Sequence, residues 1–261
     1  MNNTIKFSVD AKNDGKRLDI FLTEKMDQFT RSFLKKLIDN KQVKINDKVV
    51  KQNDLAKVFR VVWLLPSMDR LWLEGADGRR KFLDRLTLSF FPKHADCVLN
   101  YEKAMRERNR LLKEKMTDDV WYKALERQMA QNGLLIQSNR IDTLKKISSA
   151  QENSTTTFPI AELSLSKANG DLLNDEDEFV KALSENRHFD IMAGRTLIGP
   201  HRSDMEATYK EKGVSAKDSS TGEQKAMLIS IVLANARALK LELGYPPVIL
   251  LDEISAHLDK D

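Results

Sequence analysis

The sequence lacks the features that secreted and membrane proteins usually carry. Its 261 residues include a single cysteine, Cys97, which cannot form a disulfide within the chain. No apolar run approaches the roughly 18–20 residues that a membrane-spanning helix needs. The first residues, Met-Asn-Asn-Thr-Ile-Lys, contain no apolar signal region. These absences predict a cytoplasmic protein that has no membrane partner.

Metal-ligand spacing is also missing. The four histidines are scattered along the chain, so we expect surface or structural roles for them rather than zinc binding: His94, His188, His201 and His257. The three tryptophans are expected in the core rather than as platforms for stacked bases: Trp63, Trp72 and Trp121.

The positive charge is concentrated at one end of the chain. The whole chain has 43 Lys and Arg residues, 39 Asp and Glu residues and a net charge of +4. Residues 1–58 alone carry 13 basic and 8 acidic residues, so the remainder is close to neutral. An excess of this kind indicates a small module that faces nucleic acid, although an ordinary lysine-rich surface would have the same composition.

This basic region has the pattern of a small α/β module. Residues 4–10 alternate weakly, as in a strand, and the apolar spacing over 17–26 is helical. Thr30 is a candidate N-cap for a second helix. Val43 and Ile45 then alternate with lysines before an Asn-Asp turn, a pattern that predicts a β-hairpin.

The pattern changes from about residue 61. Residues 61–65 have the composition of a buried strand, and two long charged helices are predicted over 101–115 and 120–146, with a break at Thr117-Asp118. Residues 148–157 are polar and predict a loop. A further helix near 223–243 precedes a short apolar strand, 248–251.

Three features follow one another near the C-terminus. Ser220-Thr221-Gly222-Glu223 stands directly before the last helix, where a hydroxyl, free backbone N–H groups and the helix dipole can bind phosphate. Asp252 and Glu253 end the apolar strand, where a carboxylate can hold the water shell of Mg²⁺ and its neighbour can activate an attacking water. Ser-Ala-His-Leu-Asp then ends in Asp259. Each feature alone has a structural explanation, as an N-cap or as a strand that meets solvent.

The order and spacing of these features resemble the signature loop, Walker B strand and D-loop of ABC-type ATPase heads. The resemblance extends upstream, through the sequences VWLLPSMDRL, EGADGRRKFLD, YEKAMRERN and GPHRSD, to RecF, a family of bacterial DNA replication and repair ATPases of this class. It covers residues 61–261. It implies ATP and Mg²⁺ as cofactors, DNA binding, dimerisation of ATPase heads, and other recombination mediators as partners.

By this resemblance several residues have roles. Glu253 would be catalytic, and Asp252 would hold Mg²⁺ through water. The signature loop and D-loop would contact nucleotide held by the opposite subunit, through Ser220, Thr221, Gly222, Glu223 and Asp259. The expected fold is α/β: an incomplete ABC-type head over 60–261, with head pieces 60–91 and 191–261 and a helical lobe over about 92–190 inserted between them.

The N-terminal residues have a resemblance of their own. Gly15-Lys-Arg-Leu-Asp, Thr30-Arg-Ser and Val43-Lys-Ile-Asn-Asp are similar to the small αL-motif RNA-binding domain of ribosomal proteins and large-subunit pseudouridine synthases. The resemblance implies a module over 1–59 that binds structured RNA, mainly through phosphates and shape. The side chains expected to bind nucleic acid are Arg31, Lys35, Lys36, Lys44 and Lys48.

One motif of a complete ATPase head is absent. No stretch of the 261 residues fits G-x-x-x-x-G-K-[ST], the loop whose N–H groups and lysine hold nucleotide phosphates. The one Gly-Lys pair, Gly15-Lys16, has Asp10 where the first glycine should stand and Arg17 after the lysine. RecF-like proteins carry this loop near their N-terminus and continue beyond the D-loop, so we expect a truncated head that is not an independent ATPase.

Two other functions remain open from the sequence. A non-catalytic RNA- or DNA-binding fusion protein fits the basic module. A pseudouridine synthase-related enzyme would need a catalytic aspartate in a His-Arg-Leu-Asp context, and the nearest match, His201-Arg202-Ser203-Asp204, lacks the leucine. The sequence does not decide between a functional fusion, a decayed gene product and a misassembled reading frame.

Overall fold

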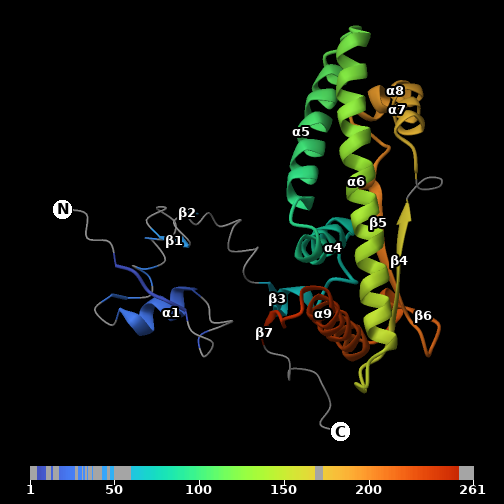
Figure 1. Cartoon of the computed structure of the whole chain (residues 1–261). Coiled ribbons are helices and arrows are strands. Elements are labelled where there is room, and N and C mark those ends of the chain that lie inside the picture. Colours follow the sequence, from blue (N-terminus) through green and yellow to red (C-terminus); the bar gives the residue numbers. More distant parts are fainter. Residues whose placement is uncertain are drawn as a thin grey trace. The chain divides into compact units, whose positions relative to one another are not determined.

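The computed structural model contains two compact units, residues 1–61 and 62–261 (Figure 1). The described residues are 5–9, 13, 18–26, 29, 30, 32, 34, 37, 43–45, 48, 49, 60–167 and 173–252. Each unit has its own core and is described separately. Across these described residues, no helix is long and apolar enough to cross a membrane.

Among its described residues, the first unit contains helix α1 and a short hairpin. Helix α1, Leu18–Lys25, packs Phe21 and Leu22 against Leu34, and these three side chains are buried. Strands β1 (Lys44–Ile45) and β2 (Lys48–Val49) pair antiparallel, which confirms the predicted hairpin. Residues 5–9 were expected in a strand, but they form none.

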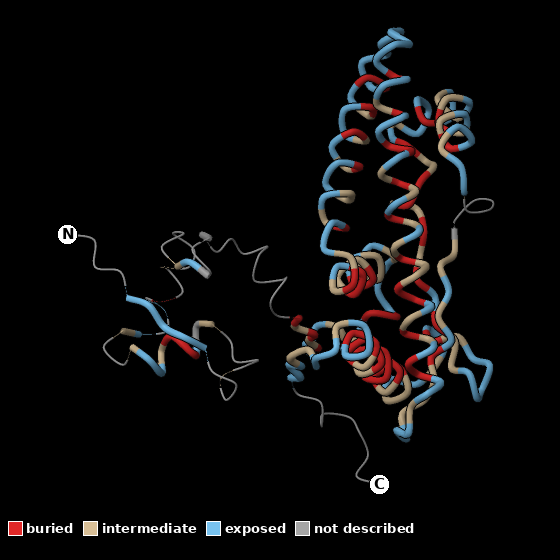
Figure 2. The backbone as a smooth tube through the Cα atoms, in the orientation of Figure 1, coloured by how far each residue is buried: buried red, intermediate tan, exposed pale blue. Residues whose placement is uncertain are grey.

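The second unit is an elongated body built around one helix, α6, Asp119–Glu152 (Figure 1). Its 34 residues span about 51 Å. Figure 2 shows buried positions recurring along its length. The apolar ones belong to one cluster in the head and two in the arm. One half of α6 packs with α5 (His94–Lys113) and α7 (Glu176–Glu185) in an arm. The other half packs with α4 (Ala76–Phe90) and α9 (Thr221–Leu243) in the head.

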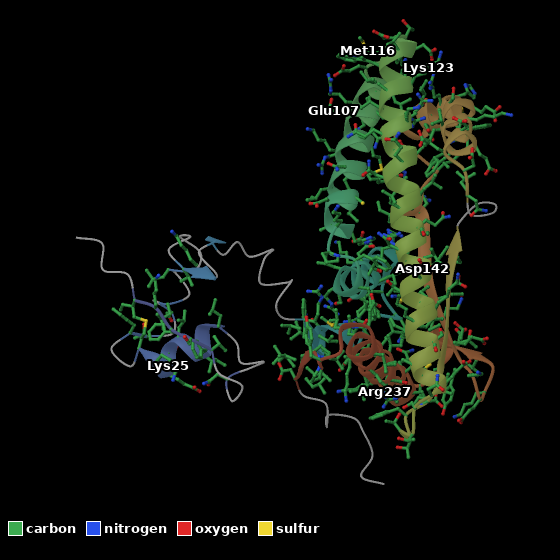
Figure 3. The ribbon with its side chains drawn as sticks, in the orientation of Figure 1. Lys25, Glu107, Met116, Lys123, Asp142 and Arg237 are labelled. Atoms are coloured by element: carbon green, nitrogen blue, oxygen red, sulfur yellow. The ribbon has the colours of Figure 1, made fainter. Side chains whose placement is uncertain are left out.

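The break between α5 and α6 lies where the sequence predicts it, although α5 begins earlier than the expected residue 101, at His94. The turn between α5 and α6 has Lys115 at φ 52°, and Asp118 caps α6 by accepting hydrogen bonds from the backbone N–H groups of Val120 and Trp121. Met116 and Lys123 mark this far end of the arm, and Asp142 marks the level of the head (Figure 3). Trp121 is 52% exposed at the tip, so its expected place in the core is wrong.

The head carries the strands of this unit; of the remaining short elements, α8 (Arg187–Ala193) lies beside α7 in the arm (Figure 1). Strand β3 (Val61–Leu64) pairs with β7 (Val248–Leu251), and β4 (Ala161–Lys167), β5 (Ser203–Tyr209) and β6 (Val214–Ser215) form an antiparallel sheet in that order. The other elements are η1 (Pro66–Met68), η2 (Pro200–Arg202) and η3 (Ala216–Asp218).

Two expectations for the middle of the chain need correction. The range 148–157 was expected to be a loop, but α6 continues to Glu152 because Ala150 and Gln151 are buried in the head. The range 92–190 was expected to be a helical lobe, but it also contains strand β4, which pairs with β5 over its whole length. The chain therefore returns from the arm as a strand of the head sheet.

Candidate functional site

The signature loop, Ser220–Glu223, forms the exposed first turn of α9. Ser220 is the N-cap: its hydroxyl accepts a hydrogen bond from the backbone N–H of Glu223 at 3.3 Å. The Glu223 carboxylate accepts one in return from the N–H of Ser220 at 2.8 Å. This reciprocal capping box satisfies two of the N–H groups that a helix leaves unpaired and fixes the loop's shape.

The charge at this helix start is balanced locally. Lys212, from the turn between β5 and β6, forms an ion pair with Glu223. Hydrogen bonds from Lys212 and from the Ser220 backbone and hydroxyl lower the pKa of Glu223 to about 2. The carboxylate is therefore ionised at neutral pH, and the lysine offsets the negative charge that would otherwise repel an anion.

Gln224 supports the loop from inside the head. Its side chain is buried, and its Nε2 donates to the carbonyls of Ser219 at 3.0 Å and Lys217 at 3.4 Å. Behind it, the ammonium of the buried Lys225 lies 3.3 Å from Asp69. Sequence reasoning missed both Gln224 and Lys212. Neither residue belongs to the Ser-x-Gly pattern, so the pattern does not indicate a role for them. Their role follows from their positions beside the N-terminus of α9.

The donors of the signature loop fit a phosphate oxygen. The capping box uses the N–H groups of Ser220 and Glu223, and within the described part of the chain those of Thr221 and Gly222 have no hydrogen-bond partner. The Ser220 hydroxyl accepts one bond, and its hydrogen, which otherwise bonds the Glu223 carboxylate, can rotate to a phosphate oxygen. These three donors stand at the positive end of a 23-residue helix, which favours an anion.

The Walker B-like strand is also formed as predicted. Residues 248–251 make strand β7, which pairs with β3, and the backbone N–H of Asp252 donates to the carbonyl of Leu64 at 3.1 Å. Asp252 is exposed just beyond the strand. Ile249, Leu250 and Leu251 are each more than a third exposed. Glu253 and Asp259 lie outside the described residues, so their expected roles stay predictions.

The predicted nucleic-acid residues are only partly described. Lys44 is exposed on β1, and Lys48 is on β2, paired with Ile45 in the hairpin. Arg31, Lys35 and Lys36 lie outside the described residues. Their role in binding stays a prediction.

The GPHRSD segment is a structural junction between arm and head. The backbone of Gly199 has φ 132°, and a Cβ there would lie 2.1 Å from the hydroxyl of Tyr101. His201 is mostly buried: its Nε2 lies 3.0 Å from the carbonyl of Thr196, and its Nδ1 lies 2.7 Å from the Tyr101 hydroxyl. Burial lowers the pKa of His201 to about 4, so the ring is neutral.

Asp204 has no freedom to act as a catalytic carboxylate. Arg79 binds it in a bidentate pair, with Nε to Oδ1 at 2.8 Å and Nη2 to Oδ2 at 2.7 Å. This pairing fastens α4 to the start of β5. Asp204, the aspartate that a pseudouridine synthase would need for catalysis, therefore has a structural role in this fold. Among the described residues, no group of three or more acidic, histidine or cysteine side chains could hold a metal ion.

Comparison with known proteins first defines the class of each unit. The family model described as "S4 domain" matches residues 16–62, which confirms the predicted RNA-binding-type resemblance of the N-terminal unit. The rest has the fold of a RecF head and arm. It superposes on "the recombination mediator protein RecF-ATPrS in RecFOR pathway" with a TM-score of 0.70 at 24% identity, covering 83% of this chain and 61% of that one. A second RecF structure, titled RecF-ATP, gives a TM-score of 0.69.

The particular relatives are proteins called "DNA replication and repair protein RecF". That of Mesorhizobium japonicum is 43% identical over 231 residues, covering 84% of this chain and 60% of the relative. That of Rickettsia bellii is 40% identical over 232 residues, covering 87% and 64%. The predicted resemblance to RecF is confirmed. The chain spans about 60% of the length of the relatives it matches.

Proposed function

We propose that this chain is a DNA replication and repair protein of RecF type that presents the signature-loop half of a nucleotide site. The observation that carries the proposal is the preformed signature loop on α9, with the donors of Ser220, Thr221 and Gly222 directed to solvent in a segment similar to RecF. In this reading the loop contacts ATP held by another ATPase head. DNA and other recombination mediators would be its further partners.

The chain would not hydrolyse ATP by itself. Its 261 residues contain no G-x-x-x-x-G-K-[ST] loop, so they supply no cradle for the β- and γ-phosphates. Asp252 stands at the end of β7, where it could hold Mg²⁺ through water, and Glu253 follows it as the candidate base. Without a phosphate loop these two carboxylates have no nucleotide to act on.

A turnover assay tests this directly. Purified chain is expected to release phosphate from Mg-ATP no faster than a buffer blank, and the Glu253→Gln variant should match it. Turnover above background that disappears in Glu253→Gln would contradict the proposal, because it would require a complete site within this chain. Turnover that persists in the variant would indicate a contaminating ATPase.

A second function is supported by a separate observation. The N-terminal unit matches the S4 domain, and residues 1–58 carry the positive excess of the chain. We propose that this unit binds structured RNA in preference to duplex DNA, through the basic side chains of Arg31, Lys35 and Lys44. Under this reading the whole chain could serve as a non-catalytic nucleic-acid-binding fusion protein.

Replacing Arg31, Lys35 and Lys44 together by alanine tests this second function. Binding to a fluorescent RNA hairpin should weaken at least tenfold, and its dependence on salt should flatten, since three phosphate contacts would be lost. The matched control replaces three exposed lysines of the second unit, Lys123, Lys145 and Lys181. Equal loss in both triple variants, or stronger binding to duplex DNA than to the hairpin, would contradict it.

A further inference from the structure

Strand β4 has one edge that pairs with β5 and one edge that faces away from it. The register pairs Ala161 with Tyr209, and the N–H of Lys210 donates to the carbonyl of Ile160 at 3.0 Å. Residue 160 therefore forms a hydrogen-bonded pair across the ladder, and so do the even-numbered residues of β4. The N–H and carbonyl groups of Ala161, Leu163 and Leu165 consequently point to the other edge.

At Ala161 this outer edge is already occupied by a side chain. The amide of Gln151 donates to the carbonyl of Ala161 at 2.9 Å and accepts from its N–H at 2.9 Å. One side-chain amide thus makes both hydrogen bonds that a neighbouring strand would make. Along the same edge, no partner is recorded for the backbone groups of Leu163 and Leu165 in the described part of the chain.

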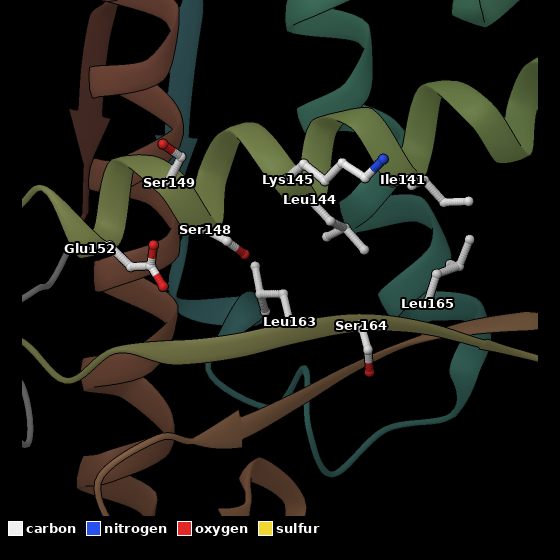
Figure 4. A pocket seen from close by; sticks show the side chains of 9 residues that line it. All are labelled: Ile141, Leu144, Lys145, Ser148, Ser149, Glu152, Leu163, Ser164 and Leu165. Atoms are coloured by element: carbon white, nitrogen blue, oxygen red, sulfur yellow. The ribbon is translucent and has the colours of Figure 1, made fainter.

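The unpaired stretch opens into a groove between α6 and β4 (Figure 4). The groove has a volume of about 490 Å³. Apolar side chains of both elements line it: Ile141, Leu144, Leu163 and Leu165. Figure 4 shows Leu163 and Leu165 directed toward α6 and Ser164 directed away from it. Half-buried leucines beside unpaired backbone groups are what an added strand would cover.

The charges on α6 set the polarity of such a strand. Lys145 and Glu152 are exposed on the rim, seven residues apart on the helix and hence about 10.5 Å apart along its axis. Glu152 also forms an exposed ion pair with Lys210 at 3.3 Å, which a basic residue of the added strand would share or replace. Figure 4 shows that α6 and β4 run in opposite directions, with Glu152 near the start of β4. A strand added antiparallel to β4 would therefore have its N-terminal end near Lys145 and its C-terminal end near Glu152.

We propose that β4 is a docking edge for an extended peptide segment of a partner protein, with the pattern acidic-x-apolar-x-basic. Residues i, i+2 and i+4 of a strand share one face and span about 13 Å, close to the spacing of the two rim charges. The central apolar side chain of the peptide covers Leu163 and Leu165. The peptide backbone pairs with the outer edge of β4, next to the stretch that Gln151 already occupies. This proposal is independent of the nucleotide and RNA proposals, because it involves neither the signature loop nor residues 1–58.

The peptide's own backbone provides the sharpest test. The probe is fluorescein-labelled Thr-Glu-Ser-Leu-Ser-Lys-Thr, titrated with the full chain and followed by fluorescence polarisation. In an antiparallel ladder, residues directly opposite each other have side chains on the same face. The peptide residues opposite Leu163 and Leu165 therefore face α6, and these are the residues whose backbone groups hydrogen-bond to β4. N-methylation of the peptide leucine should therefore weaken binding at least tenfold, whereas N-methylation of either serine should change it less than twofold.

Variants of the chain complete the experiment. Lys145→Glu should weaken binding at least threefold and Lys181→Glu, on the surface of α7, should not; a peptide whose glutamate is replaced by lysine, with its original lysine kept opposite Glu152, should recover the loss in Lys145→Glu. Leu163→Pro removes an outer-edge N–H without removing a bond to β5, so it should abolish binding with the fold retained by circular dichroism. Absence of binding at 1 mM peptide, or equal effects of leucine and serine methylation, would overturn the proposal. Self-association of the chain that Leu163→Pro removes would assign the edge to a second copy instead.

Discussion

The imidazole of His201 shows how one buried residue can make the stability of this fold depend on pH. The Thr196 carbonyl can only accept a hydrogen bond, so Nε2 of His201 carries the proton and Nδ1 accepts from the Tyr101 hydroxyl. Burial opposes a positive charge here, and Arg202, Arg80 and Arg108 add to the effect. The pKa is about 4 in the folded chain, below the ordinary value of about 6.5.

The sign of the resulting pH dependence follows from linkage. Between about pH 6.5 and pH 4 the unfolded chain binds a proton on this histidine and the folded chain does not, so stability falls as the pH falls. Between pH 7 and pH 5 the loss from His201 alone is expected to be about 2 kcal/mol.

Urea unfolding at pH 7 and pH 5 measures this effect. His201→Gln should remove about 2 kcal/mol of the pH-dependent loss, whereas His188→Gln, on the exposed side of α8, should leave it unchanged. An identical pH dependence in the wild type and His201→Gln would show that the histidine is not held neutral in the folded chain.

At the scale of elements, the arm is joined by a buried charge network. Arg108 of α5, Glu126 of α6 and Asp190 of α8 each have 0% side-chain exposure. The guanidinium of Arg108 lies 3.1 Å from Glu126 and 2.7 Å from Asp190, and it also donates to the Thr196 hydroxyl at 2.8 Å. Arg187 binds the other side of Glu126 at 2.6 Å. These bonds connect α5, α6 and α8 beside the apolar cluster of Leu111, Leu112 and Tyr122.

Removing the central arginine should therefore loosen the arm. Arg108→Met leaves Glu126 and Asp190 buried with fewer partners, and the expected loss is about 3–5 kcal/mol in the free energy of unfolding. The matched control, Arg110→Ala on the same helix, breaks half-exposed pairs with Glu107 and Glu114 and should leave the free energy of unfolding nearly unchanged. Chemical denaturation followed by circular dichroism compares them, and similar losses in both variants would contradict the account.

The elements that the sequence predicts well are those with a local signal. Helices α5, α6 and α9 have apolar positions at helical spacing, and the break between α5 and α6 coincides with the Asp118 cap. The continuation of α6 through Ser148 and Ser149 was not predictable, because a polar serine pair resembles a loop unless the buried Ala150 and Gln151 beside it are known. Strand β4 was missed for a similar reason, since it is stabilised by the distant β5.

The candidate site divides in the same way. The Ser220 cap and the Asp252 strand end could be located from residue type and order. The ion pair between Lys212 and Glu223, and the support of the loop by Gln224, depend on contacts that folding creates between separate segments. The sequence identifies GPHRSD only as a motif. Its role as a junction depends on the close approach of Gly199 to Tyr101, which the sequence does not show.

At the scale of the whole molecule, the chain combines an S4-like unit with a RecF-like head and arm. Ile249 to Leu251 of β7 are exposed, and the donors of the signature loop face solvent. The proposed function therefore depends on association, because the chain offers signature-loop donors but no phosphate loop of its own.

The central claim is tested most directly by nucleotide-dependent association with an intact RecF, such as that of Mesorhizobium japonicum carrying its Walker B glutamate replaced by glutamine. Analytical ultracentrifugation at micromolar concentration, with and without Mg-ATP, measures the heterodimer. The account predicts a heterodimer only with ATP, abolished by Ser220→Arg and retained in Thr155→Arg, a control in an exposed loop of the head. A heterodimer that forms equally without ATP, that survives Ser220→Arg, or that does not form at all would contradict it.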